Sequence, residues 1–187
     1  FVGMETETYP GSEEQVKALL QEFEPDYIVG SVHNAGIIPF DYSQEEYDRA
    51  VAALGGIDQL YCHYFDVQLG MLEQLIPSVV GHFDLIRIFD IDYEKRLQRK
   101  EIAERIVRNL DFIKNNGLIL DFNLRSLLKG AREPYVSRPI LEMALERGID
   151  VVPGDDSHGV DSIGVNLDNA MDMLQNLGFN TEWKRPF

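Results

Sequence analysis

Short apolar runs alternate along the chain with longer stretches in which apolar residues recur at every third or fourth position. The short runs predict buried strands, and the longer stretches predict helices with one apolar face. We expect strands at 1–4, 26–32, 77–81, 118–122, 149–153 and 178–183. We expect helices at 12–23, 43–54, 57–76, 93–116, 139–148 and 169–177. Because the two kinds of element alternate, their order predicts an α/β fold with a parallel sheet and right-handed crossovers.

Several predicted helices carry recognisable end signals. Ser12 with Gln15, and Ser43 with Glu46, have the spacing of a capping box at a helix start. The longest helix, 93–116, is followed by a glycine that suits a helix end. Its apolar stripe should face the core, and it consists of Ile102, Ile106, Leu110 and Ile113.

The number of strands bears on whether the domain is complete. Five or six strands are too few to close an eight-stranded barrel. The chain opens on Phe1 rather than on methionine, inside a predicted strand, and it contains no linker, repeat or low-complexity segment. We therefore expect a single domain over residues 1–187 that is the later part of a longer protein, with an N-terminal portion missing.

Composition and charge narrow the class of protein. The chain of 187 residues is 44% hydrophobic and 26% charged, which suits a folded domain with a substantial core. Its formal net charge of -15 repels nucleic-acid phosphates and anionic membranes, and no apolar run reaches the roughly 18 residues of a membrane span. Cys62 is the single cysteine, so there is no disulfide framework. We expect no nucleic-acid or membrane partner and a cytoplasmic location.

Six polar residues lie at or just past the ends of the predicted strands, and five of them are of types that bind metals. In a parallel α/β fold the carboxyl ends of the strands meet at one edge, where such folds build their sites. Individually, a glutamate after a strand is most simply a solvated turn residue, and a histidine there is most simply a hydrogen-bonded core residue. Their joint occurrence predicts a centre for Zn, Mn or Fe(II) without thiolate ligands. The residues concerned are Glu5, His33, His82, Asn123, Asp156 and His158.

Other reactive residues allow more than one interpretation. Asp156 and His158 form a D-x-H step, which in an extended chain puts both side chains on one face. Arg87 follows His82 closely and is either a surface cation or a phosphate contact. Cys62 and the adjacent histidine fall within a predicted helix and are interpreted as structural.

Five motifs in a fixed order give the chain a family resemblance. These are GMETE, GSVHN, GHFDLIR, LDFN with the later EPYVSRPIL, and GDDSHGVDSIG. Together they resemble the histidinol-phosphate phosphatases of the PHP (polymerase and histidinol phosphatase) superfamily, most closely the fungal form. The resemblance covers essentially the whole chain. It implies the C-terminal part of a distorted seven-stranded (β/α) barrel with a site for two to three divalent transition metals.

The resemblance also implies a role for each matching residue. Glu5 would bridge two metals, and His33 and His82 would bind one of them. Asp156 would bind the metal on the other side, and His158 the third. Arg87, Asn34 and Asn123 would contact substrate, although Asn34 stands where many relatives have a second histidine or an aromatic residue.

The implied activity is hydrolysis of L-histidinol phosphate to L-histidinol and phosphate in histidine biosynthesis. Metal ions would supply a hydroxide near neutral pH and neutralise the phosphoryl oxygens, with Arg87 beside them. Asp156, His158 or a metal-bound water would protonate the leaving alkoxide. The family's N-terminal H-x-H motif has no counterpart in this chain. Two alternatives stay open: a PHP-type nuclease or other phosphoesterase, and a fragment inactive without its N-terminal part.

Overall fold

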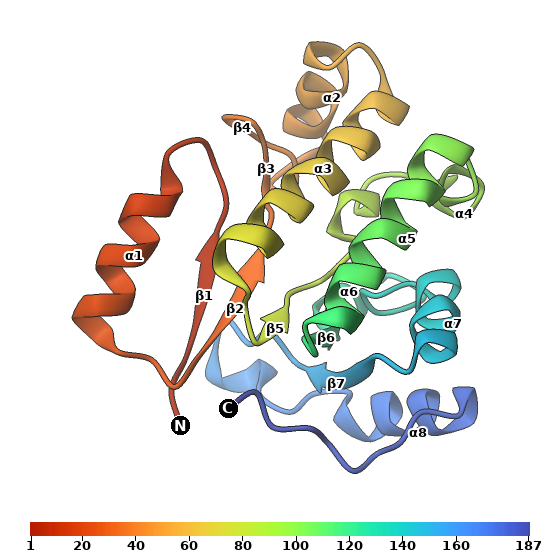
Figure 1. Cartoon of the computed structure of the whole chain (residues 1–187). Helices are drawn as coiled ribbons and strands as arrows, with labels where there is room; N and C mark the ends of the chain where they lie inside the picture. The colour runs from red at the N-terminus through yellow and green to blue at the C-terminus, as the bar shows by residue number, and fades with distance from the viewer.

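The computed structural model describes all 187 residues and contains helices and strands in regular alternation (Figure 1). The strands are β1 (Gly3–Glu7), β2 (Tyr27–Ser31), β3 (Asn34–Ala35), β4 (Ile38–Pro39), β5 (Val79–Val80), β6 (Ile119–Asn123) and β7 (Asp150–Gly154). The α-helices are α1 (Ser12–Phe23), α2 (Gln44–Ala53), α3 (Ile57–Leu75), α4 (Tyr93–Leu97), α5 (Lys100–Asn115), α6 (Arg125–Leu128), α7 (Arg138–Arg147) and α8 (Leu167–Leu177). Two short 3-10 helices are η1 (Leu85–Arg87) and η2 (Val160–Ser162).

Five strands form one sheet in the order β1-β2-β5-β6-β7, and every neighbouring pair is parallel. The predicted parallel α/β fold is therefore confirmed. Because all five strands run the same way, the loops that follow them open at one edge of the sheet. The remaining two strands, β3 and β4, form a small antiparallel hairpin in the loop after β2.

The core lies where the long helices cover the sheet. Figure 1 shows α3, α5 and α7 grouped on one side of the strands, with α1 standing apart beside β1. The predicted stripe of α5 is confirmed, because its apolar residues are fully buried: Ile102, Ile106, Leu110 and Ile113. The two termini lie together, and the rings of Phe1 and Phe187 stack with centroids 3.8 Å apart (Figure 1).

The predicted strand at 178–183 is wrong, because the chain after α8 forms no strand. Side chains satisfy the backbone there instead of a neighbouring strand. The carboxamide of Asn180 accepts from the amide of Glu182 at 2.9 Å, which makes a local turn. Trp183 packs against the core from this irregular segment.

The long predicted helix at 93–116 is interrupted, and α4 and α5 replace it. Arg99 has an extended backbone, with φ -65° and ψ 133°. Arg96 binds Asp58 and Asp90, and Arg99 also binds Asp58. These ion pairs accompany a break that the apolar periodicity could not reveal.

The two predicted capping boxes have different outcomes. Ser43 caps α2 as expected, since its hydroxyl accepts from the amide of Glu46 at 3.3 Å. The prediction for Ser12 is wrong, because Gly11 is the N-cap of α1 and adopts a left-handed φ of 87°. The Ser12 hydroxyl instead accepts from the amide of Tyr9 at 3.2 Å.

None of the helices combines the length and the apolar character needed to cross a bilayer.

Candidate metal centre

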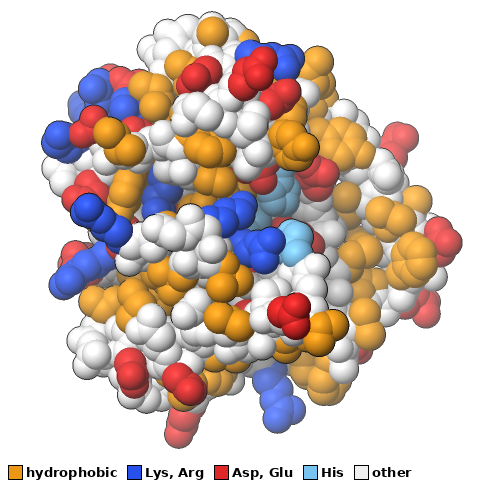
Figure 2. All heavy atoms as spheres, turned by 180° about the vertical axis from the view of Figure 1, so that it is seen from behind, with side chains coloured by type: hydrophobic (Ala, Val, Ile, Leu, Met, Phe, Trp, Pro, Cys, Tyr) orange, Lys and Arg blue, Asp and Glu red, His pale blue; other side chains and the backbone are white.

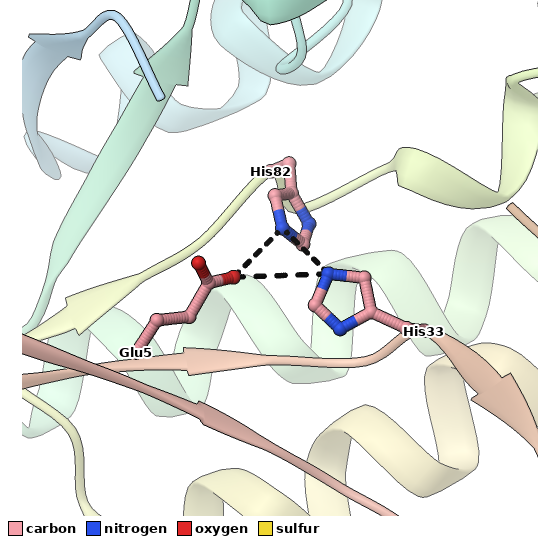
Figure 3. A group of neighbouring side chains, drawn as sticks. All are labelled: Glu5, His33 and His82. Carbon is pink, nitrogen blue, oxygen red and sulfur yellow. Dashed lines mark hydrogen bonds and ion pairs between the residues drawn. The ribbon is translucent and has the colours of Figure 1, made fainter. Parts of the chain in front are cut away.

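Three side chains from different parts of the chain converge at the edge of the sheet (Figure 3). Glu5 projects from within β1, rather than from beyond its end as we expected. His33 and His82 come from the loops after β2 and β5, two strands that are neighbours in the sheet. The parallel order of β1, β2 and β5 therefore brings the carboxylate and both imidazoles together.

The distances within this group suit a metal ion. Nε2 of His33 lies 3.2 Å from Nε2 of His82, and Oε1 of Glu5 lies 3.2 Å from Nε2 of His82 and 3.7 Å from Nε2 of His33. Ligand atoms about 2.0–2.1 Å from a tetrahedral zinc ion would be about 3.3 Å from one another. Two imidazoles and one carboxylate are also a donor set that Zn and Fe(II) accept. The residues present therefore fit a metal ion.

The charges within the group are mutually dependent. Partial burial raises the pKa of Glu5, but the hydrogen bond and charge of His82, with smaller contributions from Ser31 and His33, lower it to about 2. Burial and the neighbouring His82 lower the pKa of His33. Burial opposes the charged form of His82, yet the hydrogen bond to Glu5 raises its pKa overall. Glu5 is thus ionised and stabilises positive charge on the neighbouring His82, and a cation site requires such an ionised carboxylate.

The backbone at His82 is shaped to deliver its ring. His82 has a positive φ of 21°, which is uncommon for a residue with a side chain and typical of functional positions held by their surroundings. The preceding Gly81 has no room for a side chain, because a Cβ there would lie 2.4 Å from Oγ of Ser31. Tyr64 donates its hydroxyl hydrogen to the carbonyl of Phe83 at 3.1 Å and so holds the loop that carries His82.

A second group of polar residues, called here the second wall, lines the same cavity. This cavity of about 630 Å³ is lined by Glu5 and His82 and by the second wall, which consists of Asp121, Asn123 and Asp156. The carboxamide nitrogen of Asn123 donates to Oδ2 of Asp121 at 2.9 Å and to Oδ2 of Asp156 at 3.3 Å. The structure therefore brings Asn123 and Asp156 to the predicted site.

His158 does not join this group. Its side chain is 63% exposed, and its Nδ1 lies 2.9 Å from the backbone oxygen of Asp156. The premise that the D-x-H step is extended is wrong, because Asp156 adopts a left-handed φ of 49°. Its role as a ligand of a third metal remains a prediction.

The two other predicted substrate contacts are engaged with protein atoms. Arg87 is not a surface cation, since its side chain is 6% exposed and pairs with Asp84 at 3.2 Å. Asn34 donates its carboxamide hydrogen to Oε1 of Glu7 at 2.7 Å. Their roles as substrate contacts remain predictions. Cys62 and His63 lie on α3 as expected, outside the group of Glu5, His33 and His82.

Sequence reasoning missed Asp121 as a member of the site. Burial raises the pKa of this carboxyl to about 6, and it lines the cavity two residues before Asn123 on β6. A signal was available, because an ionisable residue within an apolar buried strand is rare unless it has a partner. Its spacing of two from Asn123 also places both side chains on one face of the strand. Glu7, which lies 3.9 Å from Nδ1 of His33, was missed as well.

The comparisons with known proteins agree with one another on the kind of protein that this chain is similar to. The family model described as PHP domain matches residues 1–125. A Schizosaccharomyces pombe protein named "Probable histidinol-phosphatase" is 35% identical over 185 residues, which are 97% of this chain and 60% of that protein. The Saccharomyces cerevisiae histidinol-phosphatase is 30% identical over 206 residues, with coverage of 94% and 61% respectively.

A solved structure shares the fold. The crystal structure from Listeria monocytogenes assigned as the histidinol phosphatase hisK superposes with a TM-score of 0.77 and 28% sequence identity, covering 87% of this chain and 65% of that one. The chain thus spans 60% to 65% of the length of these relatives.

Proposed function

Because the chain belongs to the PHP domain family, we propose that it forms part of a metal-dependent phosphomonoesterase that hydrolyses L-histidinol phosphate to L-histidinol and phosphate. The observation that carries this proposal is the convergence of Glu5, His33 and His82 at one edge of the sheet. The names of the relatives support the substrate, since those proteins are described as histidinol-phosphatases.

We propose that the complete site holds two to three divalent ions of Zn, Mn or Fe. Glu5, His33 and His82 would hold one ion. Oε1 of Glu5 faces both imidazoles, and Glu5 and Asp156, which line the same cavity, would hold a second ion. Bound ions of this kind supply a hydroxide near neutral pH and stabilise the charge on phosphoryl oxygens.

The chain's own residues would orient the ester and move the proton. Asn123 holds the carboxylate of Asp156 at the cavity wall, so that this carboxylate has a fixed place. Asp156, which lines the cavity, or the exposed His158 two residues later, is the group we propose to protonate the leaving alkoxide. A cavity of about 630 Å³ is large enough for a small phosphate ester.

Lys and Arg side chains lie near the site despite the acidic chain (Figure 2). The net charge is -15, yet Figure 2 shows Lys and Arg side chains gathered beside the hollow in which histidine side chains are visible. Carboxylates of Glu5, Asp121 and Asp156 line the cavity itself, so bound metal ions would have to neutralise them before a phosphate could enter.

We propose that full activity also needs polypeptide outside these residues. The chain spans about 60% of its longer relatives, and both edge strands of the sheet, β1 and β7, have one unpaired side. A further segment that pairs with an edge strand would add ligands to the centre. A longer polypeptide should therefore hydrolyse the ester faster than the chain of 187 residues, and equal rates would contradict this part of the proposal.

Replacement of Glu5 by Gln tests the metal centre. The wild-type chain should retain at least one equivalent of transition metal after dialysis, measured by elemental analysis. Glu5→Gln should lower metal affinity and phosphate release from L-histidinol phosphate by at least about tenfold, because it removes the anionic ligand. Glu14→Gln, an exposed carboxylate on α1, is the matched control. Unchanged metal content in Glu5→Gln would refute the assignment.

A further inference from the structure

The segment Glu133–Ser137, called here the strap, connects α6 to α7 and passes beside the site. Its central residue Tyr135 forms an isolated antiparallel bridge with Asn123, and the Tyr135 amide donates to the Asn123 carbonyl at 3.1 Å. The Tyr135 ring also meets the His82 ring edge to face, with centroids 6.5 Å apart. The strap therefore contacts both walls of the cavity.

A buried ion pair fastens the strap. Nη2 of Arg87 donates to the carbonyl of Pro134 at 2.6 Å and to that of Glu133 at 3.2 Å. Oδ2 of Asp84 accepts from the amide of Ser137 at 3.0 Å and from Nε of Arg87 at 3.2 Å. The side chains of Arg87 and Asp84 are 6% and 0% exposed. Both ends of the strap are thus bound to one pair of charges from η1 and the residue before it.

The guanidinium group of Arg87 is committed to protein atoms. Two of its three nitrogens already donate to the strap and to Asp84, and its carbon atom Cζ lies 4.6 Å from the Tyr135 ring centroid and 4.9 Å from that of Tyr93. A two-point grip on phosphate would require Arg87 to release these partners. Burial opposes its charge, but the carboxylates of Asp84 and Glu133 keep the pKa of Arg87 above its usual value.

The ring of His82 lacks the usual support of a metal ligand. A ligating histidine normally donates its second ring N–H to a carboxylate, carbonyl or water, which fixes the ring orientation. Nδ1 of His82 is buried and has no hydrogen-bond partner. The positive φ of His82 also needs surroundings that hold it. The contact with Tyr135 is therefore a support for the ring that the structure does show.

We propose that Arg87 and Asp84 are positioning residues: they fasten the strap, and the strap holds Tyr135 against His82 so that His82 points its Nε2 into the metal centre. This inference rests on the proposed metal centre. It assigns Arg87 a role at the site without contact to the phosphate.

The test uses the chain of 187 residues in metal-free form. Zinc affinity is measured by competition with a chromophoric chelator, and the His82 to Tyr135 ring contact is measured by NOE. Arg87→Lys keeps the charge but cannot reach all the acceptors, so we expect roughly 10- to 100-fold weaker zinc binding and loss of the NOE. Arg132→Met, an exposed arginine next to the strap, removes a charge without these contacts and should change neither readout.

A second variant covers the case in which Arg87→Lys does not fold. Tyr135→Leu leaves the ion pair intact and removes the ring, and it should weaken zinc binding over the same range. Wild-type zinc affinity with a retained NOE in Arg87→Lys, or wild-type affinity in Tyr135→Leu, would overturn the inference. If the wild-type chain itself binds no zinc, the metal centre fails, whereas the NOE comparison still decides whether Arg87 positions Tyr135.

Discussion

Gly154, the last residue of β7, gives the most direct test of how the second wall of the cavity is built. A Cβ at this position would lie 2.2 Å from Oδ1 and 3.2 Å from Cγ of Asp121, well inside van der Waals contact. Asp121 cannot simply turn away, because its Oδ2 accepts from the carboxamide of Asn123 at 2.9 Å. The change Gly154→Ala must therefore displace either the carboxylate or the strand.

The expected cost follows from this overlap. Forcing one methyl group into a packed site typically costs about 1–3 kcal/mol in unfolding free energy. For a chain of this size, each kcal/mol lowers the melting temperature by about 2–4 °C, so Gly154→Ala should melt about 2–12 °C lower. The same displacement should pull Asn123 away from Asp156 and weaken metal binding at that wall.

Thermal unfolding followed by circular dichroism measures the effect, with two alanine controls. Gly159→Ala lies in the same loop region, where a Cβ would meet no atom within 4 Å, and it should leave stability unchanged. Gly70→Ala lies inside α3 with equally open space, and it should stabilise the chain by about 0.5–1 kcal/mol because alanine favours helix.

A double-mutant cycle isolates the clash itself. In an Asp121→Ala background the oxygen that meets the new methyl group is gone, so Gly154→Ala should cost close to nothing. An equal loss of stability in both backgrounds would refute the reasoning, since the cost would then come from the strand rather than from Asp121. If Gly154→Ala lowered stability in neither background, the second wall would be able to accommodate the methyl group without cost.

Three further predictions concern stability and reactivity. Arg96→Met should lower the unfolding free energy by about 3–5 kcal/mol in urea titration, because it leaves Asp90 buried without the partner that now lies 2.5 Å away; a loss below 1 kcal/mol would contradict this. Ser43→Ala should cost about 1 kcal/mol by removing the cap of α2, whereas an unchanged transition midpoint would argue against the cap. Burial raises the pKa of Cys62, so its alkylation at pH 8 should be slower in the folded chain than in urea, and the gap should narrow above pH 10. Equal rates at pH 8 would speak against a raised pKa.

The regular elements of the fold were predictable because each depends on a local pattern. The stripe of α5 and the cap at Ser43 follow from residues three or four positions apart. The break before α5 is accompanied by ion pairs to Asp58, which lies about 40 residues away in the chain and binds both Arg96 and Arg99. No window of sequence contains both partners. The same is true of the irregular C-terminal segment, where Trp183 packs against distant core residues.

The candidate site also contains residues that the sequence could predict and residues that depend on distant contacts. The sequence could predict the group of Glu5, His33 and His82, because residues at the carboxyl ends of parallel strands lie at one edge of the sheet. This prediction required only the order of the strands. The orientation of side chains beyond that edge is set by backbone torsions that residue types alone do not reveal. The backbone of Asp156 is left-handed, so the spacing of the D-x-H step does not predict the exposed position of His158.

The position of Arg87 depends on a contact still more distant in the chain. Its sequence position beside a metal ligand suits a phosphate contact, but whether it faces ligand or protein depends on the strap that folds over it some 46 residues later. The place of a residue that reaches a site through tertiary packing therefore has to be read from a structure, whereas the place of a residue at the end of a strand follows from the order of the strands.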